Sequence, residues 1–283
     1  MTISSFMVYS SLECAGNYSS FLHIVSVCVD KANAILNLNT MDIDGKNIKP
    51  DHHDIKLDHV TFSYDQRKII DDISLTIPEK TTTAIVGPSG GGKTTLCNLI
   101  ARFWDVDSGT VTLGGINVKD YSMNSLMNNF AFVFQRVYLF ADTIENNIKF
   151  GCQNATHEEV VAAAKKACCH DFISALPDGY NTVIGEGGAT LSGGEKQRIS
   201  IARAIMKDAP IVILDEATAN VDPENEKELM EAVEALTKEK TIIMIAHRLK
   251  TVRHADQIIV IDQGHIVQQG NHCLLYTSPS PRD

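Results

Sequence analysis

Long apolar runs and an excess of basic side chains are both missing from this chain of 283 residues. No apolar run reaches the roughly 18 residues that a membrane helix needs, and the longest, residues 21–29, is interrupted by His23 and Ser26. We therefore expect no membrane-spanning segment. The chain has 25 basic and 35 acidic residues and a formal net charge of -10, so a broad nucleic-acid-binding surface would form against the field of the whole protein. We therefore expect no nucleic acid partner.

The seven cysteines have neither regular spacing nor a CxxC motif, although Cys168 and Cys169 are adjacent. This argues against a zinc site or a disulfide framework and favours a reducing, cytoplasmic setting. What the chain does have is the composition of a globular protein, with 44% hydrophobic and 21% charged residues. Its length allows one large domain or two small ones.

The two ends differ from the middle of the chain. Residues 1–39 carry apolar side chains in a loose helical rhythm and predict one or two helices, and the polar, Gly/Pro-punctuated residues 40–54 are interpreted as a linker. Residues 273–283 have no helix or strand period and resemble translated sequencing-adaptor DNA, so they are interpreted as an adaptor or cloning scar. The globular domain is expected at residues 55–272.

Within this domain, strands alternate with helices, which predicts an α/β fold. Residues 56–64 and 72–77 predict two strands that pair antiparallel at the front of the domain. Residues 82–86 predict a strand that leads into a glycine loop, and the short β-branched and aliphatic runs 211–214, 241–245 and 258–261 are typical of buried parallel strands. The Ala-rich helical patterns 158–168 and 195–206 fall in a stretch, residues 141–204, that we interpret as a helical subdomain.

A glycine loop follows the predicted strand 82–86. It reads GPSGGGKT from residue 87 to 94 and fits the GxxxxGK[ST] pattern between a strand and a predicted helix, 95–103. Such a loop turns backbone N–H groups toward phosphate oxygens at the positive end of a helix. Lys93 would reach the β and γ phosphates, and the Thr94 hydroxyl would bind Mg²⁺. The nucleotide-binding residues predicted here are Gly87, Pro88, Ser89, Gly90, Gly91, Gly92, Lys93, Thr94 and Thr95.

A second motif is the apolar strand 211–214 that ends in two carboxylates, Asp215 and Glu216. At the carboxyl edge of a phosphate-binding sheet, Asp215 would hold Mg²⁺ and Glu216 would polarise the attacking water. These two motifs predict a P-loop nucleoside triphosphatase (RecA-like core), a class that includes kinases, GTPases and motors.

A third motif, LSGGE at residues 191–195, places Ser192, Gly193 and Gly194 before a helical pattern that begins at Glu195, which predicts a second anion-binding helix N-terminus. With it, residues 55–272 strongly resemble the nucleotide-binding domain of ABC transporters. The resemblance implies an ATPase with ATP and Mg²⁺ as ligands, in which two domains pack head to tail and residues 192–195 of one close over the γ-phosphate bound by the other.

The resemblance also assigns roles to single residues. It implies that Tyr64 stacks on adenine, that Gln135 contacts Mg²⁺ and the attacking water, and that His247 contacts the γ-phosphate. Asp222 would lie in the loop that crosses the dimer interface. Because every expected functional group is present, hydrolysis is expected as well as binding, with Glu216, His247, Gln135 and Lys93 as catalytic residues.

Several segments resemble exporter-type half-transporters, in which the ATPase follows six membrane helices: VTFSYD, TIENNI and LSGGEKQR. Residues 1–39 would then be the end of the last membrane helix and its connector, and the domain would act at the cytoplasmic face of the membrane with a transmembrane domain and a second nucleotide-binding domain as partners. Three alternatives stay open: a soluble ABC ATPase, an importer subunit, and a nucleotide-gated regulatory module with little turnover.

Overall fold

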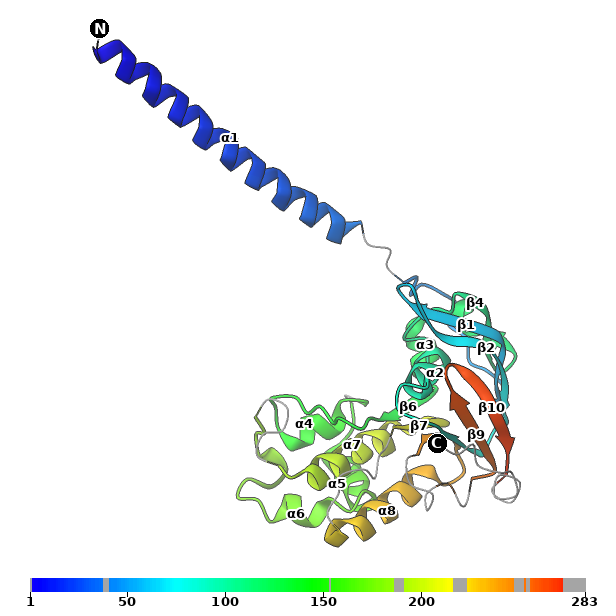
Figure 1. The fold of residues 1–283 in the computed structure, drawn as a ribbon. Helices are drawn as coiled ribbons and strands as arrows, with labels where there is room; N and C mark the ends of the chain where they lie inside the picture. Colours follow the sequence, from blue (N-terminus) through cyan, green and yellow to red (C-terminus); the bar gives the residue numbers. More distant parts are fainter. Residues whose placement is uncertain are drawn as a thin grey trace. The chain divides into compact units, whose positions relative to one another are not determined.

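The computed structural model describes residues 2–37, 41–152, 154–185, 191–215, 223–246, 252 and 255–271. The chain divides into two compact units, residues 1–42 and 43–283 (Figure 1). The first unit is one helix, and the second is a mixed α/β body with two sheets.

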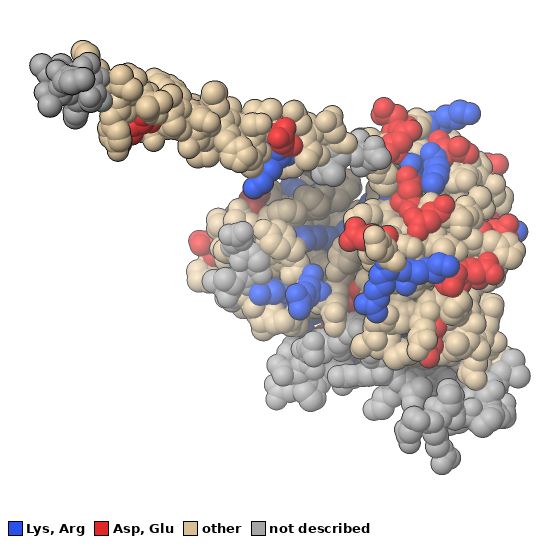
Figure 2. Space-filling view, turned by 45° about the horizontal axis from the view of Figure 1, so that its top comes forward, with Lys and Arg blue, Asp and Glu red and all other residues tan. Residues whose placement is uncertain are grey.

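Helix α1 (Thr2–Leu36) is a single helix of 35 residues, where the sequence predicted one or two. Its side chains from residue 7 to 37 are all exposed. Figure 2 shows most of α1 without charge, while the second unit carries acidic and basic side chains throughout the face in view. By length and composition, Met7–Leu36 is apolar enough to cross a membrane, although this is weak support on its own. Uninterrupted apolar runs alone predicted no membrane span, whereas the exporter resemblance implied that residues 1–39 are the end of a membrane helix.

The first sheet of the second unit is antiparallel and has the strand order β2-β1-β4-β5. The predicted pairing at the front of the domain is confirmed, since β1 and β2 pair antiparallel from Ile55↔Ile77 to Tyr64↔Arg67. Strand β2 begins five residues before its predicted start because a tight turn after Tyr64 lets the chain pair at once. The four strands are β1 (Ile55–Tyr64), β2 (Arg67–Ile77), β4 (Ser108–Leu113) and β5 (Ile116–Asn117).

The second sheet has the order β10-β9-β3-β8-β7-β6. Strands β9, β3, β8, β7 and β6 are parallel, and β10 adds an antiparallel edge. The three parallel strands predicted from aliphatic runs and the strand predicted before the glycine loop are confirmed, while β6 and β10 were not predicted. The strands are β3 (Thr82–Val86), β6 (Phe130–Val133), β7 (Ile211–Asp215), β8 (Thr241–Ile245), β9 (Gln257–Asp262) and β10 (His265–Gly270).

The helices divide between two apolar cores. Helix α2 (Lys93–Ile100) packs between the two sheets, with Leu96, Leu99 and Ile100 fully buried in the first core. The second core lies on the other face of the parallel sheet and joins α5 and α7 to β7. The remaining helices are α3 (Met123–Met127), α4 (Ile144–Lys149), α5 (His157–Lys166), α6 (His170–Ser174), α7 (Gly193–Lys207), α8 (Pro223–Thr237) and the short 3-10 turns η1 (Val118–Asp120) and η2 (Gly179–Asn181).

Part of the expected linker is docked on the second unit. The backbone of Lys46 donates to Asp120 (2.8 Å) and accepts from Ser122 (2.8 Å). The Ile48 N–H donates to the Ser125 hydroxyl oxygen (3.0 Å), and the same hydroxyl donates to the Ile48 carbonyl. Pro50 is buried. The polar composition of residues 40–54 concealed this packing, because backbone hydrogen bonds do not depend on side-chain polarity.

Candidate nucleotide-binding site

The glycine loop connects β3 to α2, as the sequence predicted. Gly92 is the N-cap of α2, with φ 105° and ψ 4°, and it makes no side-chain capping hydrogen bond. The left-handed backbone there is accessible to glycine at little cost. A helix whose first N–H groups lack a side-chain cap offers them to a ligand, and the helix dipole favours an anion. This end of α2 is therefore suited to phosphate.

Lys93 occupies the first turn of α2 and is only 6% exposed. Its Nζ donates hydrogen bonds to the carbonyl oxygens of Gly87 (2.9 Å) and Pro88 (2.8 Å). These two carbonyl oxygens, which are neutral acceptors, thus hold the ammonium group at the loop. A phosphate oxygen would offer it a charged acceptor at the same place, and charge-assisted hydrogen bonds are the stronger kind.

The loop forms one wall of a pocket of 330 Å³. Tyr64 from β1 and the β2 residues Arg67 and Ile69 also line it. Arg67 and Ile69 were not predicted, although strand alternation puts residues two apart on the same face and would have grouped them once β2 was extended. The other lining residues are Ser89, Gly90, Gly92, Lys93, Thr94 and Thr95. Gly87, Pro88 and Gly91 belong to the same loop without lining the pocket.

Tyr64 belongs to a group of three aromatic rings. Its ring meets that of Phe62 edge to face, with centroids 4.9 Å apart, and that of Trp104 in the same manner at 5.3 Å. Phe62 is buried in the first core, so the group connects the pocket to the interior. These contacts hold the Tyr64 ring on two sides.

The carboxyl edge of the parallel sheet brings further predicted residues to the same side. Asp215 pairs in register with Ile245, and Ile85 of β3 also pairs with Ile245. Asp215 therefore lies level with the end of β3, two strands or about 10 Å away. Burial raises the pKa of Cys97 on α2, and the negative charge of Asp215 raises it further. The field of Asp215 thus reaches the helix that follows the glycine loop.

Gln135 lies two residues after β6, which pairs with β7 up to Val133↔Leu214. It is exposed at the carboxyl edge beside the strand that ends in Asp215. Glu216, Asp222 and His247 fall outside the residues that the structure describes.

The LSGGE residues lie at the start of α7. Ser192 is its N-cap: its hydroxyl accepts from the N–H of Glu195 (3.3 Å), and the Glu195 carboxylate accepts from the N–H of Ser192 (2.7 Å). This reciprocal pair is a capping box. Ser192 and Gly193 are exposed, and none of residues 192–195 lines the glycine-loop pocket. Within this chain the two predicted anion-binding helix ends therefore form separate sites.

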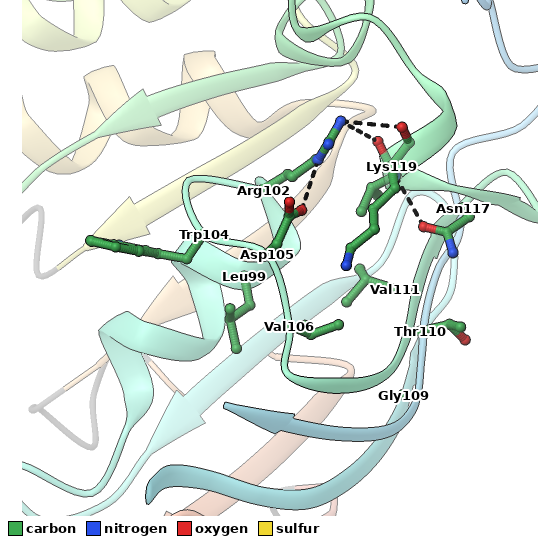
Figure 3. Close-up of a pocket in the computed structure, with 11 residues that line it drawn as sticks. Leu99, Arg102, Trp104, Asp105, Val106, Gly109, Thr110, Val111, Asn117 and Lys119 are labelled. Carbon is green, nitrogen blue, oxygen red and sulfur yellow. Dashed lines mark hydrogen bonds and ion pairs between the residues drawn. The ribbon is translucent and has the colours of Figure 1, made fainter. Parts of the chain in front are cut away.

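A second pocket, of 190 Å³, lies beyond the C-terminal end of α2 (Figure 3). Arg102, which is 2% exposed, donates from Nε to Asp105 (3.0 Å) and from Nη1 to the carbonyls of Val118, Lys119 and Tyr121 (3.3 to 3.4 Å). Its donors thus tie α2 to η1. We interpret this pocket as a packing gap between the end of α2, β4 and the β5–η1 segment.

Comparison with known proteins agrees with this geometry. Residues 70–219 match the family model described as ABC transporter. The chain is 49% identical over 229 residues to an ATP-dependent lipid A-core flippase of Desulfotalea psychrophila, covering 81% of this chain and 40% of the relative. It is 51% identical over 220 residues to a putative multidrug export ATP-binding/permease protein of Staphylococcus aureus, covering 77% of this chain and 38% of the relative.

Among solved structures, a bacterial Atm1-family ABC exporter with ATP bound has a TM-score of 0.81 and 36% identity to this chain. The match covers 92% of this chain and 49% of the exporter. The chain thus spans less than half the length of each of these proteins. The family match includes the glycine loop, the LSGGE segment and the β7 carboxylate, and with the fold agreement it shows that this chain belongs to the ABC transporter family.

Proposed function

We propose that residues 55–272 bind and hydrolyse Mg-ATP, and that they form the ATPase domain of an exporter. The observation that carries this proposal is the 330 Å³ pocket, which an aromatic side chain, Tyr64, lines together with a glycine loop and the uncapped start of α2. An aromatic ring suits a purine, and helix N–H groups suit the phosphates that follow it. Arg67 adds a cation at the same pocket.

The proposal assigns roles to residues of the pocket and to residues predicted from the sequence. Tyr64 stacks on adenine, Lys93 binds the β and γ phosphates, and the loop N–H groups orient the phosphate chain. Glu216 positions water for in-line attack on the γ-phosphorus, with Gln135 and His247 beside it. Catalysis of phosphoryl transfer depends mainly on such positioning and on fixed charges.

The donor set around the loop suits Mg²⁺. Thr94 offers a hydroxyl, Gln135 an amide oxygen and Asp215 a carboxylate, and Mg²⁺ prefers oxygen ligands, commonly one or two carboxylates together with substrate phosphates. When bound, the ion would neutralise charge on the phosphates. No group of three or more His, Cys, Asp or Glu side chains suited to a metal occurs among the described residues.

The N-terminus of α7 supports a head-to-tail dimer. Its exposed Ser192 and Gly193 lie outside the pocket of their own chain, so a second copy or a related chain would bring them to the γ-phosphate. Asp222 would lie in the interface between the two domains. In this arrangement each ATP is bound by the glycine loop of one domain and the α7 N-terminus of the other.

Two features support a membrane partner and a place at the cytoplasmic face of the membrane. The relatives named above are a flippase and an export protein more than twice as long as the matched segment, and α1 is apolar enough to cross a bilayer.

A third feature is a group of aromatic side chains at the surface. Tyr138 and Phe150 are 55% and 60% exposed, and both rings contact Phe140. We propose that residues 1–39 belong to the end of a membrane domain, that the transmembrane domain contacts these aromatic side chains, and that residues 273–283 are foreign to the fold.

The proposal is tested by Glu216→Gln in the full chain, purified in mild detergent. We expect the wild type to hydrolyse Mg-ATP with a rate that rises faster than linearly with protein concentration. The Glu216→Gln chain should retain ATP and shift to a dimer in size-exclusion chromatography only when Mg-ATP is present. A variant that binds ATP and keeps the same elution volume would contradict the homodimer, and a wild type that binds no ATP would contradict the proposed function.

A further inference from the structure

The turn between β9 and β10 lies directly behind the glycine loop. It contains Gln263 (φ 47°) and Gly264 (φ 83°), and the flanking residues Asp262 and His265 pair with each other. Two consecutive residues with positive φ are what a two-residue type I′ hairpin requires, and the turn therefore has a fixed shape. No residue of this turn lines the nucleotide pocket.

Gly264 makes backbone hydrogen bonds on two sides. Its N–H donates to the carbonyl of Gly91 in the glycine loop (3.1 Å), and its carbonyl accepts from the N–H of Asp71 on β2 (2.9 Å). Strand β2 carries Ile69, which lines the pocket together with residues of the glycine loop. One residue outside the pocket therefore connects two of the segments that line it.

The bond to Gly91 has a consequence for the phosphate-binding amides. In a trans peptide, the C=O of one residue and the N–H of the next point in opposite directions. Because Gly264 holds the Gly91 carbonyl on the hairpin side, the N–H of Gly92 points to the other side, where the pocket lies. This N–H begins the uncapped helix end.

The approach is close enough to require glycine. A Cβ added at Gly264 would lie 2.4 Å from the carbonyl oxygen of Ile69, which is a backbone atom and cannot move aside as a flexible side chain can. The hairpin also supports the start of the loop, where a Cβ at Gly87 would lie 1.9 Å from the carbonyl oxygen of Ile261 on β9. The hairpin, the loop and β2 are thus in backbone contact.

From these contacts we infer that Gly264 is a positioning residue for the nucleotide. It orients the Gly91–Gly92 peptide toward the phosphates and sets the spacing between the glycine loop and the strand pair that carries Tyr64 and Ile69. Because Gly264 touches no ligand itself, its effect on nucleotide binding passes through the two backbone hydrogen bonds. This inference rests on the proposed ATP binding at the pocket.

The test compares Gly264→Ala with Gly115→Ala in the full chain. Gly115 lies in the β4–β5 turn with a similar φ of +72°, but an added Cβ there meets nothing within 4 Å, and Gly115 does not line the pocket. Both substitutions place alanine in a left-handed backbone, so both should lower the thermal stability of the nucleotide-free protein. Only Gly264→Ala also moves the backbone against which the loop rests.

We expect Gly264→Ala to raise the Kd for Mg-ATP at least tenfold, and Gly115→Ala to leave it within twofold of wild type. Equal Kd values for Gly264→Ala and wild type would overturn the inference. If the wild type binds no ATP, the proposed function fails and the inference fails with it.

A measurement on the wild type covers the case in which Gly264→Ala does not fold. Amide hydrogen exchange at Gly264 and Asp71 should slow when Mg-ATP is added, and exchange at Gly115 should not change. Protection confined to the amides of residues 92–95, with Gly264 and Asp71 unchanged, would overturn the inference.

Discussion

The indole ring of Trp104 meets the phenol ring of Tyr64 edge to face, with their centroids 5.3 Å apart and their planes at 87°. Trp104 is the only tryptophan of the chain and is 49% exposed. It lies outside the glycine-loop pocket that Tyr64 lines, and Figure 3 shows its ring turned away from Arg102 and Asp105. A ligand that stacks on Tyr64 would therefore change the surroundings of the Trp104 indole, although Trp104 does not line the pocket.

This geometry predicts a fluorescence signal for nucleotide binding. Adding Mg-ATP to the wild type should change the Trp104 emission in a saturable way. Tyr64→Ala should weaken ATP binding by about 5- to 150-fold, because stacking of a base on an aromatic ring contributes roughly 1–3 kcal/mol. Tyr64→Phe should stay close to wild type. Since Tyr64→Ala also removes the ring beside the indole, its Kd is measured by calorimetry.

Tyr138→Ala is the matched control, because it removes a tyrosine that is 55% exposed and does not line the pocket. Its Kd for ATP should equal that of wild type. A Tyr64→Ala chain that binds ATP as tightly as this control would contradict the stacking role.

Measuring ATP affinity with and without Mg²⁺ should distinguish the contribution of Asp215 from that of the glycine loop. Asp215→Asn keeps the shape of the side chain but removes its negative charge, so the affinity for ATP should fall at least tenfold in the presence of Mg²⁺ and change little in EDTA. Asp178 is exposed, so Asp178→Asn serves as the control for loss of one negative charge. Equal affinity of Asp215→Asn and wild type with Mg²⁺ present would show that Asp215 does not hold the ion.

Four of the five parallel strands, β3, β7, β8 and β9, were predictable from the sequence because their residues are mostly buried. The runs at Thr82–Val86 and Thr241–Ile245 are continuous and aliphatic, and both strands form with these bounds. Strand β10 was missed because its side chains alternate between exposed and half-buried and include two glutamines, so no apolar run marks it. Its place is set by pairing with β9, which is a contact that local composition does not encode.

The candidate site, like the fold, was predictable only where a local sequence pattern marks it. The glycine loop is contiguous, and its motif places Lys93 and Thr94 directly. Arg67 and Ile69 were missed because their part in the pocket depends on how the antiparallel sheet packs against the loop. The contacts of Gly264 were missed for the same reason: they join residues more than 170 positions apart in the chain, and they involve backbone atoms only.

Asn147, within α4, is predicted to stabilise the fold through several buried hydrogen bonds. It is 1% exposed, its Oδ1 accepts from the N–H of Phe140 (2.9 Å) and from Arg203, and its Nδ2 donates to the carbonyls of Phe140 (3.1 Å) and Thr143 (2.9 Å). Asn147→Ala leaves several buried polar groups without partners, so we expect the free energy of unfolding in urea to fall by about 2 kcal/mol or more.

The neighbouring Asn146 provides the control for Asn147. It is exposed, and its side chain donates to Asp142 (2.9 Å) in contact with water. Asn146→Ala should change the free energy of unfolding by no more than about 0.5 kcal/mol. Similar losses for both variants would contradict the stabilising role of the buried Asn147 hydrogen bonds.

We predict that the ionised Glu145 carboxylate adds to the free energy of unfolding and that this contribution is lost in acid. The carboxylate accepts hydrogen bonds from Lys149 (2.6 Å) and His157 (2.8 Å) and is 17% exposed. The hydrogen bond from Lys149 is the main cause that holds the pKa of Glu145 below its ordinary value; burial opposes it, and the bond from His157 adds to it. Because the folded pKa lies below the unfolded one, the unfolded state binds more protons, and this contribution is lost as the pH falls through the folded pKa.

Glu145→Gln cannot be deprotonated, so it lacks this contribution at every pH. The wild type should exceed Glu145→Gln in free energy of unfolding above the unfolded pKa of about 4.3, and the difference should shrink as the pH is lowered further. Urea unfolding at a series of pH values between neutral and acid measures it, with Glu234→Gln, an exposed carboxylate on α8, as the control for loss of one negative charge. A difference between wild type and Glu145→Gln that stays constant across this range would mean that the Lys149 and His157 contacts do not favour the ionised form of Glu145.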